Sequence, residues 1–339
     1  MIPWFNRIPA QRSLLSALVP AVFLLALSCF LSLLYGAGSI GPFEALQVLF
    51  NQGSSEAYFV VTELRLPRTL VGLFVGLSLG VAGALMQAVA RNPLAEPGLL
   101  GVSAGSTFAV ALALVMGASA ATLTVSIAQI GALVGCFCVI TAARMQGQNR
   151  DPIRLVLAGA ALSSLLVALT SLLLLYDQRA ADEIRFWVTG SVAGRGLDQL
   201  TAVLPSMFIA VMGTVYVARP LSSLALGEKV AIGLGHNPGR IRLIVIVCVA
   251  LLVGAAVAVA GPVAFVGLVV PFAARALIGP DIRRTLWLCL PIGPMVVINA
   301  DTLSRLIAQP AEMPLGVLTA IVGAPVLLAI VRARRLPTL

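Results

Sequence analysis

The chain has 339 residues, of which 60% are hydrophobic and 10% are charged, and its mean hydropathy is +1.04. Soluble domains are about 45–50% apolar and about 25% charged, so a water-soluble globular fold is excluded. The scarcity of charge also excludes a disordered chain. The composition predicts an all-α polytopic membrane protein in which residues 1–339 form a single transmembrane domain.

Ten apolar segments, separated by polar or Pro/Gly-rich breaks, are expected to cross the membrane. They are 14–35, 69–90, 100–117, 121–143, 155–176, 199–217, 242–260, 262–278, 285–306 and 315–332. The first is longer than the apolar region of a signal peptide, so we interpret it as a membrane helix. Only Gly261 and Pro262 separate the seventh segment from the eighth. A tight turn or a re-entrant element is therefore an alternative to two full spans.

The basic residues are unevenly distributed over the loops between these segments. With ten spans and an inner N-terminus, the inner side holds 16 of the 22 Lys and Arg residues against four acids, a net charge of +12. The outer side holds six basic residues against nine acids, a net charge of −3. Arginine and lysine concentrate in cytoplasmic loops, so both termini are expected in the cytoplasm. The basic excess thus indicates topology, and no nucleic-acid partner is expected.

The chain lacks the sequence signatures of nucleotide hydrolysis and of metal binding. Its only lysine, Lys229, follows Glu228, whereas a P-loop needs a Gly-Lys-Ser/Thr ending. The only histidine is His236, and the five cysteines lie inside apolar runs, so no metal site is predicted. The longest inner loop, 219–242, is too short for a soluble domain. We expect no enzymatic activity, and the energy for any active process must come from another chain.

Small residues recur at every fourth position in two of the predicted spans. They are Gly72, Gly76 and Gly80, followed by Gly83, and then Gly101 and Gly105 in the next span. Such a pattern lets helices approach closely in lipid. Packing within the chain is the favoured interpretation, and a subunit interface is the alternative.

Three further segments are candidates for function. The inner run from Arg91 to Gly101 holds two prolines and two glycines, which predict irregular backbone in a tight turn or lining a pathway. On the outer side, the run from Arg65 to Arg68 could anchor the chain at the interface or dock an acidic partner, while Asp301 and Arg305 have the spacing of a helix ion pair. The partly apolar inner loop 224–237 is a candidate docking surface or an interfacial amphipathic turn.

Together these segments resemble the FecCD-type ABC permeases, the membrane subunits of importers for iron-siderophores, haem and cobalamin. The resemblance extends from about Glu63 to Arg332 and rests on six motifs in order. They are Arg65–Arg68, Asn92–Gly101, Ala225–Gly235, Ala260–Leu268, Ala300–Arg305 and Glu312–Ala320. One departure is Phe272 after Pro271, where many members have histidine.

The resemblance implies a type II ABC importer permease of ten helices in the bacterial inner membrane, surrounded by lipid and paired with a second permease, identical or paralogous. Two cytoplasmic ATPase subunits would bind ATP and magnesium, so no cofactor is expected on this chain, and a periplasmic binding protein would deliver the substrate. The coupling loop of the family corresponds to Ala225, Leu226, Gly227, Glu228, Ala231, Leu234 and Gly235. The docking arginines correspond to Arg65, Arg68 and Arg305, and the inner gate to Asn92 and Leu94.

The expected function is import of an iron-siderophore complex, with cobalamin or haem as alternative cargo. An ion-coupled secondary transporter is a rival from another class. Such carriers usually have ionisable residues near the middle of the bilayer, whereas Asp301 is the only acid inside a predicted span and lies near one end of it. A membrane anchor or receptor without transport activity is the remaining alternative.

Overall fold

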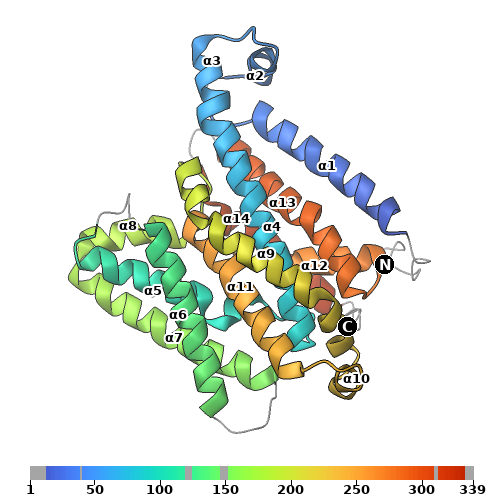
Figure 1. Ribbon diagram of the computed structural model, residues 1–339. Coiled ribbons are helices and arrows are strands. Elements are labelled where there is room, and N and C mark those ends of the chain that lie inside the picture. The colour runs from blue at the N-terminus through green and yellow to red at the C-terminus, as the bar shows by residue number, and fades with distance from the viewer. Residues whose placement is uncertain (1–12, 39, 119–123, 146–151, 309–311, 333–339) are drawn as a thin grey trace.

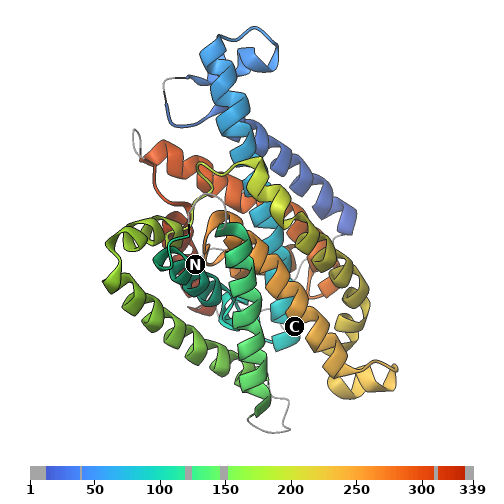
Figure 2. The same cartoon turned by 60° about the vertical axis from the view of Figure 1, so that its left-hand side comes forward.

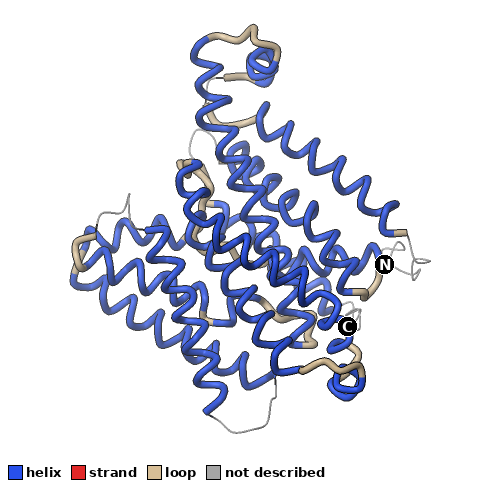
Figure 3. Tube along the Cα trace, viewed as in Figure 1, coloured by secondary structure: helices blue, strands red, loops and turns tan. Residues whose placement is uncertain are grey.

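The computed structural model describes residues 13–38, 40–118, 124–145, 152–308 and 312–332. Every regular element in these ranges is a helix, as Figure 3 shows. The helices gather into one bundle, and α2 and α3 project from one end of it (Figure 1). The predicted all-α membrane fold is therefore confirmed for the described part of the chain.

Each of the ten predicted spans coincides with a helix. Within the described residues, seven helical stretches are long and apolar enough to cross a membrane. These stretches contain α1 (Leu14–Leu34), α4 (Leu66–Ala90), α6 (Thr124–Met145), α7 (Pro152–Tyr176), α9 (Leu197–Ala225), α11 (Pro238–Ala260) and α13 (Ile282–Ile307). Three apolar helices are shorter: α5 (Val102–Val115), α12 (Val266–Ile278) and α14 (Leu315–Arg332).

Short helices occupy the connections between these elements. They are α2 (Pro42–Leu49), α3 (Ser55–Phe59), the π-helical turn η2 (Val60–Arg65), the 3-10 helix η3 (Pro97–Leu100), α8 (Gln178–Val188) and α10 (Glu228–Gly233). Residues 55–90 form one helical run of 36 residues, about 54 Å long at 1.5 Å per residue. Because the hydrocarbon core is about 30 Å thick, part of this run lies outside it. Figure 2 shows that part projecting beyond the bundle with α2 folded against it.

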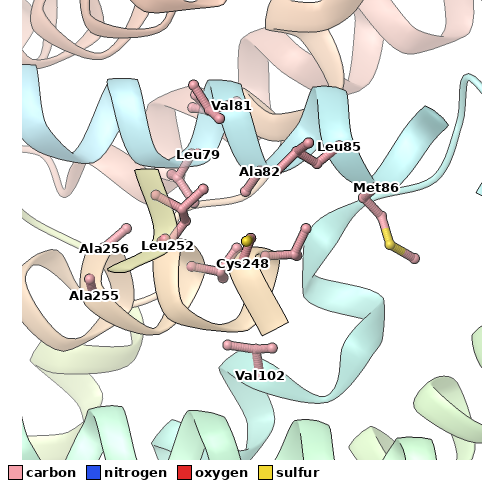
Figure 4. Close-up of a cluster of buried hydrophobic side chains, with 14 of the residues drawn as sticks. Leu79, Val81, Ala82, Leu85, Met86, Val102, Cys248, Leu252, Ala255 and Ala256 are labelled. Atoms are coloured by element: carbon pink, nitrogen blue, oxygen red, sulfur yellow. The ribbon is translucent and has the colours of Figure 1, made fainter. Parts of the chain in front are cut away.

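The centre of the bundle is built around α4 and α11. In each, 83% of the most apolar stretch is buried inside the protein, compared with 17% in α1, α7 and α9. In Figure 4, Leu79 of α4 lies close to Leu252 of α11, and Val102 of α5 lies on the other side of α11, below Cys248. The outer helices consequently direct most of their side chains toward lipid or another subunit, because lipid tails are as apolar as leucine.

The glycines of α4 allow its close approach to two neighbouring helices. A Cβ atom on Gly76 would overlap the backbone of Gly293 in α13, and one on Gly83 would overlap the carbonyl of Gly267 in α12. Gly105 is in similarly tight contact with Gly131 of α6. The prediction of intramolecular packing through these glycines is thus confirmed at these helix crossings.

The break between the seventh and eighth predicted spans is a turn followed by a short helix. α11 ends before Gly261, whose φ is +72°, and α12 begins after Phe265, whose φ is +66°. With 13 residues, α12 is about 20 Å long, which is less than the thickness of the hydrocarbon core. Of the two alternatives, the structure has the turn rather than a full span over 262–278, because residues 262–265 are not helical.

Contacts between helix ends define two sides of the bundle. The end of α1 meets the start of α4, since Arg65 donates to the carbonyl of Leu34, and the end of α13 is near the same start through Arg68 and Asp301. At the opposite side the last residues of α4 and α9 meet, where Arg91 donates to the carbonyl of Leu224. The charge asymmetry assigns the first side to the exterior and the second to the cytoplasm.

Candidate functional site

Arg65 lies at the outer end of the bundle and is directed toward the C-terminal end of α1. Its Nη1 donates to the carbonyl oxygens of Leu33 at 3.0 Å and Leu34 at 2.7 Å, and its Nη2 donates to that of Ile40 at 3.1 Å. The last carbonyls of a helix have no partner within the helix and carry partial negative charge. Arg65 therefore caps α1.

Arg305 reaches the same end of α1 from α13. Its Nη2 donates to Ser32 Oγ at 2.8 Å and pairs with Asp301 Oδ2 at 3.0 Å. Its Nη1 lies 3.3 Å from the carbonyl oxygens of both Ser32 and Tyr35. The predicted ion pair between Asp301 and Arg305 is confirmed, and it forms part of a larger network.

The burial of Arg65 and Arg305 does not fit the expectation that both bind a partner directly. Only 3% of Arg65 and 2% of Arg305 is exposed, and most of their donors are satisfied by α1 or Asp301. The sequence interpretation missed this because the acceptors are largely backbone carbonyls. In the structure these two arginines fasten α1 to α13 and to the start of α4, and their docking role stays a prediction.

Arg68 is the member of the arginine group that retains access to the surface. Its Nε and Nη2 bind the carboxylate of Asp301 at 2.8–3.0 Å, and its Nη1 binds both oxygens of Glu312 at 2.8 and 2.9 Å. The side chain of Arg68 is 11% exposed and that of Glu312 is 36% exposed. Asp301 thus lies between two arginines, whereas Glu312 contacts Arg68 from the solvent side.

The expected gate segment lies at the inner end of α4. Arg91 ends that helix with φ +48°, and Asn92 Oδ1 accepts the backbone N–H of Leu94 at 2.9 Å. The side chain of Asn92 is exposed, while that of Leu94 is half-buried. Further along, Glu96 Oε1 accepts the backbone N–H of Phe265 at 3.2 Å, so this loop contacts the N-terminus of α12.

A buried polar group links α12 to the inner half of α4. Gln87, which is fully buried, accepts a hydrogen bond from Arg275 and donates through Nε2 to the carbonyl of Leu268 at 3.4 Å. Arg275 lies inside the predicted span 262–278 and is buried in α12. Among the described residues, no three His, Cys, Asp or Glu side chains are grouped so that they could hold a metal ion.

The expected coupling loop contains α10 and lies at the inner side. Gly227 and Gly235 flank the helix with φ values of +136° and +79°, which favour glycine. Leu226 and Leu234 are exposed, whereas Ala231 is buried and anchors the helix. α10 consequently presents leucines at both of its ends to the cytoplasmic side.

Two arginines join this loop to the membrane helices. Glu228 of α10 forms an ion pair with Arg242 of α11, and Arg91 Nη2 donates to the carbonyl of Leu224 at 2.5 Å. Glu228 therefore binds within the chain, although its side chain is still 42% exposed. Ala225, the first residue of the loop, ends α9.

Comparison with known proteins gives extensive similarity. A family model described as the FecCD transport family matches residues 24–333. The chain is 41% identical over 314 residues to the ferric enterobactin transport system permease protein FepD of Escherichia coli (strain K12), covering 92% of this chain and 94% of the relative. It is 36% identical over 330 residues to the Fe(3+)-citrate import system permease protein YfmD of Bacillus subtilis (strain 168), covering 97% and 98%.

A solved structure has the same arrangement of helices over nearly its full length. It is described as an inward-facing conformation of a metal-chelate type ABC transporter, and its TM-score to this chain is 0.80 at 28% sequence identity. The match covers 94% of this chain and 99% of the other. The residues matched by the family model, 24–333, include α10, the segment 91–101 and the outer arginine group.

Proposed function

Because the chain belongs to the FecCD transport family, we propose that it is the permease subunit of an ATP-driven ABC importer that carries ferric-siderophore complexes across the cytoplasmic membrane. It is a multi-pass, non-catalytic component of that transporter. The relatives named for ferric enterobactin and for Fe(3+)-citrate support a ferric chelate as cargo. Cobalamin or haem is the alternative cargo of the same type of importer.

The observation that carries this function is the placement of two unlike surfaces at opposite ends of one membrane bundle. The inner end presents α10 with the exposed Leu226 and Leu234, a surface that fits a cytoplasmic ATPase. The outer end presents Arg68, a cation that fits an acidic group on a binding protein. A chain with no P-loop of its own needs such an inner contact to receive energy.

The complete transporter, in this proposal, contains a second permease, two cytoplasmic ATPase subunits and a periplasmic binding protein. The ATPase subunits hold ATP and magnesium. A second permease, identical or paralogous, would cover part of the apolar surface of α7 and α9, which are largely unburied in this chain. The remaining surface faces lipid.

The inner gate belongs to the segment that includes Asn92 and Leu94. This assignment is supported by the contact between Glu96 and the start of α12. The contact joins the segment to a helix that is shorter than the hydrocarbon core is thick. Irregular backbone at this depth is tolerated where it lines a path or is buried in protein. Displacement of α10 would reach the same region through Arg91, which contacts Leu224 at the end of α9.

Uptake into proteoliposomes tests the function. The assembled complex is supplied with the binding protein and a radioiron-labelled ferric siderophore, and we expect accumulation only when ATP reaches competent ATPase subunits. Matched vesicles carry ATPase subunits with a disabled P-loop lysine, and unlabelled cobalamin or haem is added as competitor. Accumulation driven by a pH or sodium gradient without the ATPases would contradict the proposal. Competition by cobalamin or haem against uptake of the labelled siderophore would identify that competitor as the cargo.

A further inference from the structure

The outer arginine group contains one carboxylate that is held less firmly than the others. Arg68 directs Nε and Nη2 at Asp301 and Nη1 at Glu312. Asp301 is buried and is held from its other side by Arg305 at 3.0 Å. Glu312 is 36% exposed and lies in the non-helical residues just before α14. Of the two carboxylates on Arg68, Glu312 is the one that can leave.

The position of Glu312 identifies the kind of group that Nη1 of Arg68 accepts. Both oxygens of Glu312 lie within 2.9 Å of that nitrogen, so the space beside it fits a carboxylate. The group formed by Arg65, Arg68, Arg305, Asp301 and Glu312 has three cations and two anions. Removal of Glu312 would leave two uncompensated positive charges, with Arg68 the one that has access to solvent.

We propose that Glu312 is an internal competitor for docking, and that an acidic side chain of the periplasmic binding protein displaces it from Nη1 of Arg68. This inference rests on the proposed importer function. Arg65 and Arg305 do not contact the partner. Arg65 fixes the end of α1, whereas Arg305 fixes Asp301, the carboxylate that holds Arg68 in place. The affinity of docking is then the difference between two carboxylates that bind the same guanidinium group.

The competition predicts opposite effects for the two members of one ion pair. Arg68→Gln removes the binding group and raises the Kd of the binding protein, whereas Glu312→Gln removes the competitor and lowers it. We expect Glu312→Gln to lower the Kd by roughly two- to fivefold, the size of a partly exposed ion pair. Glu312→Asp keeps the charge but shortens the side chain, so it lowers the Kd by a smaller factor.

The measurement is a titration of the assembled transporter in lipid nanodiscs with the binding protein carrying a ferric siderophore. Glu63→Gln is the matched control, because Glu63 is an exposed acid at the same outer end and its removal makes the same change in net charge. A Kd that Glu312→Gln raises, or lowers no more than Glu63→Gln does, overturns the inference. Thermal unfolding of each complex identifies a variant that has lost its fold. If Glu312→Gln is such a variant, the Kd of Glu312→Asp tests the inference in its place.

Failure of this inference and failure of the importer function are distinguishable. If the wild-type complex does not bind the binding protein, the importer function itself is wrong. If it binds and Arg68→Gln binds equally well, the docking role of Arg68 is wrong while uptake stays intact.

Discussion

Arg65 stabilises the fold through backbone carbonyls rather than through an acidic side chain. A guanidinium group has five donors in a planar arrangement, so Nη1 and Nη2 can serve the three carbonyls of Leu33, Leu34 and Ile40 together. A lysine ammonium is a compact charge with a strong preference for hydration and cannot reproduce this geometry. Arginine is consequently required here by shape as well as by charge.

The substitution Arg65→Lys separates this anchoring role from direct docking. We expect the complex to lose about 1–3 kcal/mol of stability, because buried carbonyls at the end of α1 lose their donors. The Kd of the binding protein should stay unchanged. Thermal unfolding and the nanodisc titration measure the two quantities. Arg185→Lys on α8, where the arginine is 71% exposed, is the control and should change neither. A higher Kd for the binding protein with unchanged stability would instead support a direct docking role for Arg65.

At the scale of elements, packing is set by glycine contacts that fix how close the helices approach. Gly76 and Gly293 each lie against the other's backbone, and Gly83 lies against the backbone of Gly267. Side chains at these positions would push α4 away from α13 and α12. The buried Gln87 then finds Arg275 and the carbonyl of Leu268 within reach, so the polar contact depends on the close apolar one.

The long apolar helices could be predicted from sequence because each is a run near 20 residues of low polarity. The shorter α2, α3 and α8 were missed, since each has 5 to 11 residues and no long apolar run. The pair Asp301–Arg305 could be predicted from its helical spacing. The pair Arg68–Glu312 joins residues 244 apart, and no local pattern encodes such a contact.

The ion pair between Glu228 and Arg242 links α10 to α11. Because α11 is largely buried inside the bundle, this contact can transmit displacement of α10 to the core. We expect Glu228→Gln or Arg242→Gln to reduce the siderophore imported per ATP hydrolysed by about two- to fivefold, the effect of losing a partly exposed pair. Assembly with the ATPase should persist, because Leu226 and Leu234 remain. The measurement compares radioiron uptake with phosphate release in the same proteoliposomes.

Two further variants decide whether the pair itself matters. Exchange of the charges, Glu228→Arg with Arg242→Glu, should recover part of the lost coupling. Arg240→Gln, which neutralises an exposed arginine near the start of the same helix, should leave the ratio unchanged. If the amount of siderophore imported per ATP hydrolysed stays normal in both Glu228→Gln and Arg242→Gln, α10 transmits motion by another route.

For the whole molecule, the distribution of charge and the positions of the two contact surfaces indicate the same orientation of the chain in the membrane. The inner side carries a net charge of +12 and the outer side −3. The helix ends that meet at Arg65 and Arg68 lie opposite those that meet at Arg91. The energy source and the substrate therefore reach the chain from different compartments, and the transmembrane helices connect them.

Side-specific labelling tests this orientation. In a background where the five cysteines are alanine, Gln52→Cys follows α2 and Ile232→Cys lies in α10, and both positions are exposed in this chain. A membrane-impermeant maleimide should label Gln52→Cys in spheroplasts and leave Ile232→Cys unlabelled, because the positive-inside rule places α10 in the cytoplasm. A permeant maleimide should label both when this chain is expressed without the ATPase.

Coexpression of the ATPase subunits extends the same measurement to the inner contact. If the ATPase covers α10, the permeant reagent should no longer label Ile232→Cys but should still label Gln52→Cys. Labelling of Ile232→Cys by the impermeant reagent would reverse the orientation. Unchanged labelling by the permeant reagent in the assembled complex would instead place the ATPase elsewhere on the inner side, because a covered thiol cannot react at the rate of an exposed one.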